Sequence, residues 1–346
     1  MAQMLAQSMT DQLRLESLLE AVGDAARLLI LAHNDPDPDA VASAAALKYV
    51  IETLTAAEVT IAYGGIVGRA ENRALVHYLG VSLQSIETVD FSSFHRIALV
   101  DSQPGAGNNS LPPRRVADIV LDHHQPFRQQ TDLASHADVR LDVGATSTIL
   151  TGYALAAGLE LFPRLATALF YGIKTDTMGL GRRAGSIDQA AYARLQPLIE
   201  VDELVAIERA QVPREYFQAF EQTLCAAEVV DGAVIAHLGE MSYPDMPAEM
   251  AEVLLRLEGT RWVMCSGFNR QTLFLSLRST QAKPTAGQVA QTVVSGLGMA
   301  GGHGTTGGGQ VPLEGQKRES LVREVQRRFL EVLGLQGIQP DKLINR

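Results

Sequence analysis

The chain has 346 residues, of which 46% are hydrophobic and 20% charged, so it is long enough for about two globular domains. Its net charge of −10 excludes a long duplex held by many phosphate contacts, but not a short nucleotide held by metal ions and a few arginines. Only two cysteines occur, and the sequence shows neither a secretory leader nor a long apolar run. We therefore expect a cytoplasmic protein without a membrane partner.

An acidic turn follows the first predicted strand. The strand, Leu28–Ala32, follows a helix predicted over 11–26 and precedes one predicted over 40–54. The turn contains His33, Asp35, Asp37 and Asp39. Carboxylates this close repel one another, and a divalent cation removes that repulsion; oxygen ligands with one imidazole favour Mn²⁺ or Mg²⁺ over zinc. The alternative is an ordinary Asp-Pro turn in which Asp39 caps the helix.

Two further apolar strands end in ionisable side chains. The strand over 96–101 ends at Asp101, and the strand over 118–122 leads into Asp122-His123-His124. Other elements predicted in this half are strands at 59–62 and 139–141 and helices at 71–79, 145–158 and 163–173. Strands alternating with helices predict an α/β domain with a mostly parallel sheet and helices on both faces. In such sheets, functional groups lie beyond the carboxyl ends of the strands.

The second half predicts a smaller α/β domain. Residues 186–230 are predicted to be mostly helical. Strands are then predicted at 233–237, 262–268 and 272–278, and helices at 247–257, 286–296 and 317–333. We therefore expect a catalytic domain over 1–205, a helical connector over 206–230 and a substrate-binding domain over 231–346.

The ionisable groups at the strand ends suit a pair of divalent ions. Such a pair needs a bridging carboxylate and terminal carboxylate or imidazole ligands. Asp101 is the natural bridge. His33 and Asp37 could complete one shell, and Asp39, His123 and Asp176 the other. Asp176 could instead be a helix C-terminal turn residue, Asp122 is expected to orient the histidines, and Asp35 is expected to be a solvated turn residue.

A glycine-rich segment lies near the C-terminus, at Gly301–Gly309. It lacks the Gly-Lys-Ser/Thr of a P-loop, but its glycines permit close approach of the backbone to a ligand. With the helix predicted at 286–296 and with Arg278 and Ser279 nearby, it predicts a phosphate or nucleobase pocket. The alternative is a flexible turn.

Taken in order, these motifs resemble the DHH phosphoesterase superfamily. The segment His33–Ala40 is similar to its first motif, Asp101 to its second, Asp122-His123-His124 to its third and Gly172–Thr177 to its fourth. The C-terminal residues that resemble a DHH-associated domain are Arg278, Ser279, Gly301, Gly302 and His303. The chain looks more like the short bacterial nanoRNase/pAp phosphatases than the long RecJ-like exonucleases. It departs from the family where Pro38 replaces a glycine and where Met299-Ala300 precede Gly301.

The resemblance implies a two-domain enzyme with a cleft between the domains, commonly a homodimer, usually dependent on Mn²⁺, with Mg²⁺ as the alternative. It implies that Asp101 bridges the two ions and that His124 contacts the scissile phosphate. One ion would take His33, Asp37 and Asp101, and the other Asp39, Asp101, His123 and Asp176. Arg278 and the Gly301–His303 loop would hold the other end of the substrate.

The leading hypothesis is therefore a metal-dependent phosphohydrolase in which two metal ions activate a water molecule. Its expected substrates are short oligoribonucleotides, linear dinucleotides or 3′-phosphoadenosine 5′-phosphate. The rival hypotheses are a cyclic-dinucleotide phosphodiesterase, a pyrophosphatase and a nucleotide-sensing protein without turnover. The lysine-rich C-terminal signature of the pyrophosphatases is not found in this sequence.

Overall fold

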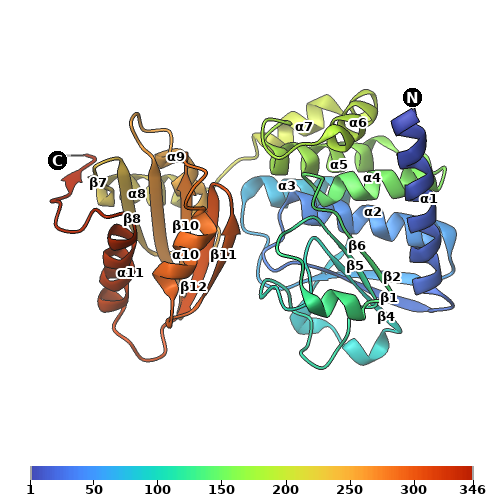
Figure 1. The fold of residues 1–346 in the computed structure, drawn as a ribbon, viewed down its shortest axis with the longest axis horizontal. Coiled ribbons are helices and arrows are strands. Elements are labelled where there is room, and N and C mark those ends of the chain that lie inside the picture. The colour runs from blue at the N-terminus through green and yellow to red at the C-terminus, as the bar shows by residue number, and fades with distance from the viewer. Residues whose placement is uncertain (1, 345–346) are drawn as a thin grey trace. The chain divides into compact units, whose positions relative to one another are not determined.

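The computed structural model describes residues 2–344, without the side chains of residues 2–8 and 303. The chain divides into two compact units, an N-terminal unit that ends at Ala210 and a C-terminal unit that begins at Gln211. Figure 1 colours them from blue to yellow-green and from yellow to red. Among the described residues, no helix is long and apolar enough to cross a membrane.

The N-terminal unit is built on a six-stranded sheet in which all neighbouring strands are parallel. Its strands are β1 (Arg27–Ala32), β2 (Glu58–Tyr63), β3 (Leu83–Ser85), β4 (Arg96–Val100), β5 (Ile119–Asp122) and β6 (His136–Val139). Their order in the sheet is β3-β2-β1-β4-β5-β6. The α/β class expected from the sequence is confirmed. After β1 the chain adds β2 and β3 on one side of the sheet, and after β4 it adds β5 and β6 on the other side. The direction in which strands are added therefore reverses between β1 and β4.

The helices of this unit are α1 (Ala2–Val22), α2 (Pro38–Leu54), α3 (Ala70–Leu79), α4 (Thr146–Ala156), α5 (Pro163–Thr177), α6 (Ser186–Leu195) and α7 (Val201–Glu208). Alternate residues of β1 point to opposite faces of the sheet. Leu28 and Ile30 belong to the core that α1, α2, α4 and α5 cover (Figure 1). Leu29 and Leu31 belong to a smaller core on the other face, closed by loops and by the short 3₁₀-helices Ile86–Thr88 and Phe91–Ser93.

The strand predicted at 139–141 is wrong, because the strand lies at His136–Val139. The residues after it do not continue a buried pattern. Leu141 is 49% exposed, and Arg140 is buried through ion pairs to Asp138 and Asp11. Burial of Arg140 thus rests on its carboxylate partners and not on the apolar pattern of a strand.

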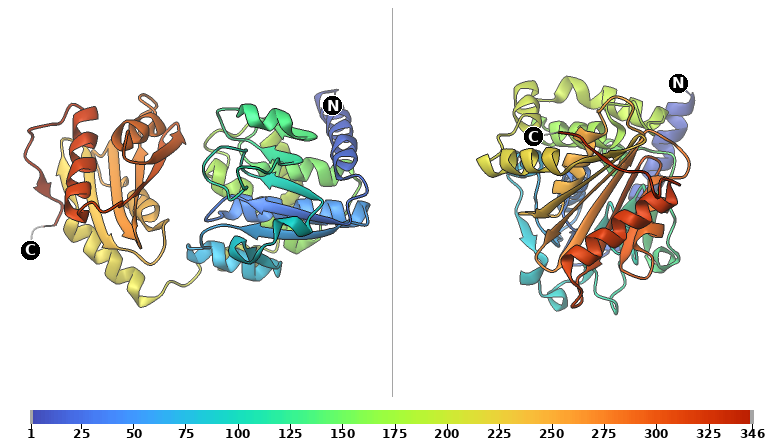
Figure 2. Two further views of the ribbon diagram at one scale, coloured as in Figure 1. Left: turned by 90° about the horizontal axis from the view of Figure 1, so that it is seen from below. Right: turned by 90° about the vertical axis from the view of Figure 1, so that its left-hand side faces the viewer.

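The C-terminal unit contains a seven-stranded mixed sheet in the order β11-β12-β10-β9-β8-β7-β13, in which only β8 and β9 pair in parallel. Its strands are β7 (Glu228–Val230), β8 (Ala233–Glu240), β9 (Trp262–Asn269), β10 (Thr272–Ser279), β11 (Met299–His303), β12 (Thr306–Pro312) and β13 (Asp341–Lys342). Its helices are α8 (Arg214–Ala226), α9 (Met246–Leu254), α10 (Ala286–Val294) and α11 (Arg318–Val332). Helices α8 and α9 cover one face of the sheet and α10 and α11 the other, where Figure 2 shows α11 in red.

The glycine-rich segment is a β-hairpin, so its interpretation as a flexible turn was wrong. Gly301 and Gly302 of β11 pair with Gly308 and Gly307 of β12. A side chain is excluded at Gly307, where an added Cβ would lie 2.5 Å from the carbonyl oxygen of Ala286 in α10. The glycines therefore let α10 pack directly against the backbone of the hairpin. Sequence propensity missed these strands because glycine is a poor strand former.

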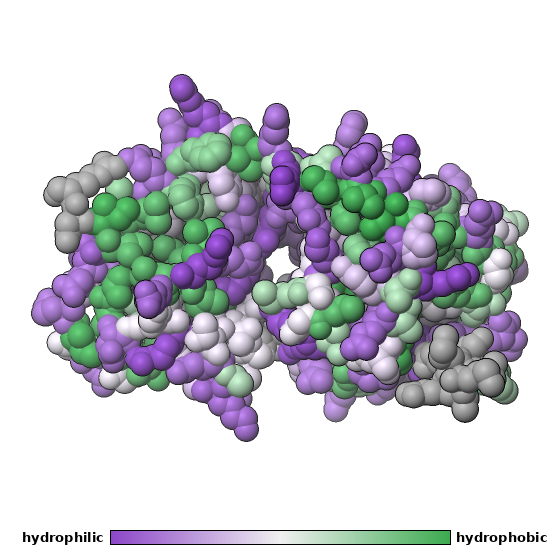
Figure 3. All heavy atoms as spheres, turned by 90° about the horizontal axis from the view of Figure 1, so that it is seen from above, coloured by the Kyte–Doolittle hydropathy of each residue, from purple (hydrophilic) through white to green (hydrophobic). Residues whose placement is uncertain are grey.

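Figure 3 shows hydrophobic side chains among hydrophilic ones on one face of the molecule. The exposed apolar side chains of the two units include Val201 and Val205 of α7 and Phe217 of α8. Exposed apolar atoms are ordinary on protein surfaces, so function has to be sought in the polar groups.

Candidate metal centre

The predicted ligands gather at the carboxyl-terminal edge of the parallel sheet. Strands β1 and β4 are neighbours there, and β5 lies beside β4. The turn after β1 carries the ligands of the first motif, β4 leads into Asp101, and β5 leads into His123 and His124. Because the strand order reverses between β1 and β4, their connections leave in opposite directions, and in sheets of this kind ligands bind at such a reversal.

The acidic turn is held by the start of α2. Asp37 is the N-cap, and its Oδ1 accepts a hydrogen bond from the backbone N–H of Ala40 at 3.0 Å. Pro38 is the first helical residue, where its fixed φ suits the helix and its missing N–H is not needed. The alternative in which Asp39 caps this helix is wrong, because Asp39 lies inside the first turn. The proline that replaces the family's glycine thus fits its position.

Asp39 is completely buried and faces the N-terminus of α4 instead. Its Oδ2 accepts from the backbone N–H of Thr146, and its Oδ1 from that of Ser147, both at 2.7 Å. These N–H groups have no partner within their own helix, so a carboxylate is favoured there. The sequence did not single out Thr146 and Ser147, which are the first two residues of α4 and follow the N-cap residue Ala145.

Asp101 follows β4 in the left-handed region of the backbone, with φ of 58°. This conformation is uncommon for a residue other than glycine, and aspartate and asparagine tolerate it best. The carboxylate is buried, and its Oδ1 accepts a hydrogen bond from Oγ1 of Thr146 at 2.8 Å. A single threonine therefore holds Asp101 through its hydroxyl and Asp39 through its N–H.

The side chains converge around Asp101. Nε2 of His33 lies 3.6 Å from Oδ1 of Asp37 and 3.6 Å from Oδ2 of Asp101. Nε2 of His123 lies 3.5 Å from Oδ1 of Asp101, 3.3 Å from Oδ2 of Asp176 and 3.9 Å from Oδ2 of Asp39. The groups whose ligand atoms lie close enough together to hold an ion are His33–Asp37–Asp101, Asp39–His123–Asp176 and Asp101–His123–His124.

Asp176 reaches this cluster because Gly172 lets α5 pass close to α2 and α4. A Cβ at Gly172 would lie 2.4 Å from Oγ of Ser147 and 3.1 Å from Oδ1 of Asp39. Asp176 lies in the last turn of α5, so it is a helix C-terminal residue and also a member of the cluster. The two interpretations of this residue are compatible.

Asp122 and Asp35 lie outside these groups. Oδ1 of Asp122 lies 2.8 Å from Nδ1 of His124, which suits a residue that orients that ring. Oδ1 of Asp35 accepts a hydrogen bond from the backbone N–H of Ile66 at 2.9 Å, so this turn carboxylate is held by the protein and not only by solvent.

The ionisation of the cluster reflects crowded, buried carboxylates. Burial, together with Asp101 and Asp176, raises the pKa of Asp39 well above its usual value, and burial raises the pKa of Asp101. Burial opposes the charge of the imidazoles, but the carboxylates outweigh it. They raise the pKa of His123 to about 10 and that of His33 well above its usual value. The buried carboxylates thus favour protonation of the neighbouring imidazoles and of one another.

The cluster fits divalent cations. Among the described residues, Oδ2 of Asp101 and Nε2 of His123 are buried without a hydrogen-bond partner. Buried polar atoms are normally satisfied, so two orphaned ligand atoms in one site indicate a missing partner. Carboxylate oxygens with a few imidazole nitrogens are typical ligands of Mn²⁺ and Mg²⁺.

The residues predicted to bind substrate in the C-terminal unit have mixed surroundings. Arg278 of β10 contacts Oε1 of Glu252 at 3.0 Å and Oγ of Ser276 at 2.7 Å. Ser279 is buried, and its hydroxyl donates to the carbonyl of Arg261 at 3.1 Å, a contact within the fold. A Cβ at Gly301 would meet nothing within 4 Å, whereas Gly302 has φ of 133° and is packed against β12. The side chain of His303 lies outside the described residues.

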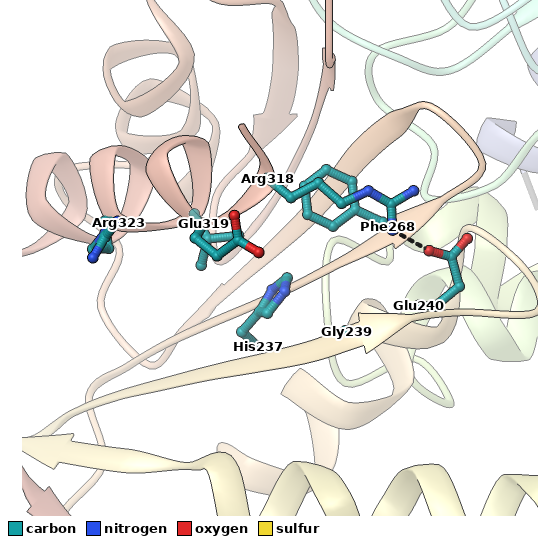
Figure 4. A pocket seen from close by; sticks show the side chains of 8 residues that line it. His237, Gly239, Glu240, Phe268, Arg318, Glu319 and Arg323 are labelled. Carbon is teal, nitrogen blue, oxygen red and sulfur yellow. Dashed lines mark hydrogen bonds and ion pairs between the residues drawn. The ribbon is translucent and has the colours of Figure 1, made fainter. Parts of the chain in front are cut away.

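A hollow of about 440 Å³ lies between β8 and the start of α11 in this unit. Figure 4 shows Arg318 stacked over the ring of Phe268, with its guanidinium carbon 4.6 Å from the ring centre, and paired with Glu240. Arg318 also donates to the carbonyl of Arg270 at 2.8 Å. The charge of this arginine is thus already compensated by neighbours in the fold.

Comparisons with known proteins concern the family and the fold of this chain. Residues 27–173 match the model described as "DHH family, N-terminal domain". An uncharacterised protein of Methanocaldococcus jannaschii is 35% identical over 321 residues, which cover 90% of this chain but only 65% of the relative's length.

Two solved structures share the fold. An exopolyphosphatase-related protein of Bacteroides fragilis has a TM-score of 0.67 at 13% identity, covering 94% of this chain and 97% of the other. RecJ of Thermus thermophilus, solved in complex with Mn²⁺, has a TM-score of 0.53 at 15% identity, covering 94% of this chain and 54% of RecJ. At these identities the likeness concerns the fold alone.

Proposed function

Because the chain carries the N-terminal domain of the DHH family over residues 27–173, we propose that it is a metal-dependent phosphoesterase with a two-ion centre. The observation that carries this proposal is the position of Asp101. Its carboxylate belongs to two of the three ligand groups at once, one with His33 and one with His123. A shared carboxylate is what a pair of divalent ions requires as a bridge. Mn²⁺ is the proposed metal, with Mg²⁺ as the alternative.

The residues around the bridge divide into two ligand sets. We propose His33, Asp37 and Asp101 for one ion, and Asp39, Asp101, His123 and Asp176 for the other. When bound, divalent ions supply the positive charge that activates water and offsets charge on a phosphoryl group. Thr146 holds Asp39 and Asp101 in place through its N–H and hydroxyl. His124, backed by Asp122, is proposed to contact the scissile phosphate.

The proposed substrates are short oligoribonucleotides, linear dinucleotides or 3′-phosphoadenosine 5′-phosphate. A net charge of −10 disfavours a long nucleic-acid track. We propose that the C-terminal unit acts as a DHH-associated domain. Its open backbone at Gly301, with Arg278 of the same unit, would receive the substrate's other end.

The catalytic domain over 1–205, the connector over 206–230 and the substrate-binding domain over 231–346 remain proposals. So do the homodimer, which light scattering would test, and the cytoplasmic location.

One experiment tests the proposed activity directly. Purified protein is incubated with Mn²⁺ and, separately, with linear dinucleotides, 3′-phosphoadenosine 5′-phosphate, cyclic dinucleotides and pyrophosphate. We expect hydrolysis of the first two classes, abolished by EDTA and by Asp101→Asn. Preferential hydrolysis of cyclic dinucleotides or pyrophosphate would replace the proposed substrate. Tight nucleotide binding without any turnover would identify a sensor instead.

A further inference from the structure

Gln103 connects two loops of the candidate metal centre without belonging to any of its ligand groups. It lies two residues after Asp101, and its side chain is only 2% exposed. Its Nε2 donates to Oδ2 of Asp122 at 2.7 Å and to the carbonyl oxygen of His124 at 2.9 Å. Its Oε1 accepts from the backbone N–H of Arg128 at 2.8 Å. The same Oε1 also accepts from Oγ1 of Thr131 at 3.4 Å. One amide from the loop after β4 therefore binds four points of the segment that begins at the end of β5.

These contacts hold both Asp122, whose carboxylate contacts the His124 ring, and the main chain of His124. The carboxylate of Asp122 is completely buried, with Oδ2 bound to Gln103 and Oδ1 lying 2.8 Å from Nδ1 of His124. A carboxylate held at both oxygens cannot rotate, so the ring that contacts it keeps one orientation. The backbone of His124 is held by the same amide. One glutamine thus holds the main chain of this histidine and the carboxylate nearest its ring, while Oδ1 of Asp101 lies farther from the same ring nitrogen, at 3.6 Å.

We propose that Gln103 is a positioning residue that aligns His124 toward the reacting phosphate by holding Asp122 and the His124 carbonyl. This inference rests on the proposed function, because it gives His124 a phosphate to contact. Removing the amide should loosen His124 while the ligands of the metal ions keep their places. The effect should therefore fall on turnover and not on metal affinity.

The first test replaces the amide and keeps its length. Gln103→Met should lower kcat for bis-p-nitrophenyl phosphate by about 10- to 100-fold, the usual cost of removing an outer hydrogen-bond partner. KM and the Mn²⁺ dissociation constant, measured by calorimetry, should stay near those of the wild type. Gln129→Met is the matched control. It makes the same change at an exposed residue of the 3₁₀-helix Gln129–Leu133, and its kcat should match the wild type.

The second test exchanges donor and acceptor. Gln103→Glu should lower kcat, because the new carboxylate and that of Asp122 then face each other in a buried position. In the double variant Gln103→Glu with Asp122→Asn, the amide at position 122 can donate to the carboxylate at position 103. Its kcat should exceed the value obtained by multiplying the effects of the two single changes, as expected for residues in direct contact.

Three outcomes would overturn the proposal. The first is an unchanged kcat in Gln103→Met. The second is a loss of Mn²⁺ affinity in that variant as large as its loss of turnover. The third is a double variant whose kcat does not exceed the product of the two single effects. If the wild type hydrolyses no phosphoester, the proposed function fails but the link to His124 can still be tested. In metal-free protein with ¹⁵N-labelled histidine, the His124 ring signals, assigned with His124→Asn, should shift in Gln103→Met and not in Gln129→Met. Unshifted signals in Gln103→Met would then overturn the proposal.

Discussion

At the scale of single residues, Asp101 combines three unfavourable properties. It has a left-handed backbone, its carboxylate is buried, and Oδ2 has no hydrogen-bond partner. Strain and unsatisfied groups of this kind persist where a site needs them. A pair of bound cations would remove the electrostatic part of this cost, and the hydroxyl of Thr146 removes part of it already.

Asp101→Asn should separate metal binding from folding. The change keeps the shape but weakens the bridge, so we expect Mn²⁺ binding and turnover to fall together, turnover by at least about 100-fold. Burial raises the pKa of Asp101, so its ionised form opposes folding at neutral pH and the metal-free variant should melt no lower than the wild type. Calorimetry with Mn²⁺ and thermal unfolding measure the two effects. A variant that binds two ions with normal turnover would refute the bridging role.

Metal affinity should rise with pH. The pKa of His123 is raised to about 10 and that of His33 well above its usual value, so nearby carboxylates favour the protonated form of both rings in the metal-free protein. A ring that binds a metal must be neutral, so binding releases protons, and affinity should increase about tenfold per pH unit for each proton released. Calorimetry in buffers of different ionisation enthalpy counts these protons. A pH-independent affinity would show that the histidines are not ligands.

At the scale of elements, the β11–β12 hairpin and α10 illustrate how glycine serves two purposes. Some glycines, such as Gly307, allow close packing against α10, whereas Gly301 has open space in front of it. Packing explains the first kind. The second kind is available for a ligand that approaches the backbone.

Alanine substitutions should distinguish these two kinds of glycine. Gly307→Ala places a Cβ 2.5 Å from the carbonyl oxygen of Ala286, and we expect a loss of about 1–3 kcal/mol in the free energy of unfolding. Gly301→Ala should keep wild-type stability and raise KM for dinucleotides. Denaturant unfolding and steady-state kinetics measure the two effects. An equally destabilised Gly301→Ala would assign this glycine to packing.

At the scale of the whole molecule, charge limits the substrate. A protein that tracks a long single strand needs a basic groove, and its affinity then falls steeply with salt. This chain has a net charge of −10, and its arginine pairs, Arg114-Arg115, Arg182-Arg183 and Arg327-Arg328, are too few to line a long channel. Much of the positive charge offered to a substrate would come from the metal ions.

The rate per end should fall as the substrate grows from a dinucleotide to about five nucleotides, because the extra phosphates gain few contacts. Time courses on 5′-labelled RNAs of increasing length at physiological salt test this expectation. Processive degradation of a long strand would refute the short-substrate proposal and favour a RecJ-like activity.

The sequence alone determined the features that depend on neighbouring residues. Apolar runs predicted the strands before His33, Asp101 and His123, and the alternation of strands and helices predicted the α/β class. Those signals are local, because strand burial and helix caps are set within a few residues. The observed boundaries of the strands and helices differ from the predicted ones by only a few positions, as at β6. The glycine hairpin was missed because its strands are stabilised by packing against α10.

Only the tertiary structure decided which strand ends meet. The adjacency of β1 and β4 follows from the order in which the sheet is assembled, and that order depends on contacts between residues far apart in the chain. The contacts of Thr146 with two ligand carboxylates and of Gln103 with the His124 segment have the same origin. Neither residue is one of the proposed metal ligands, and neither lies beside its partner in the sequence. Their roles emerge only when distant segments pack around the buried charge.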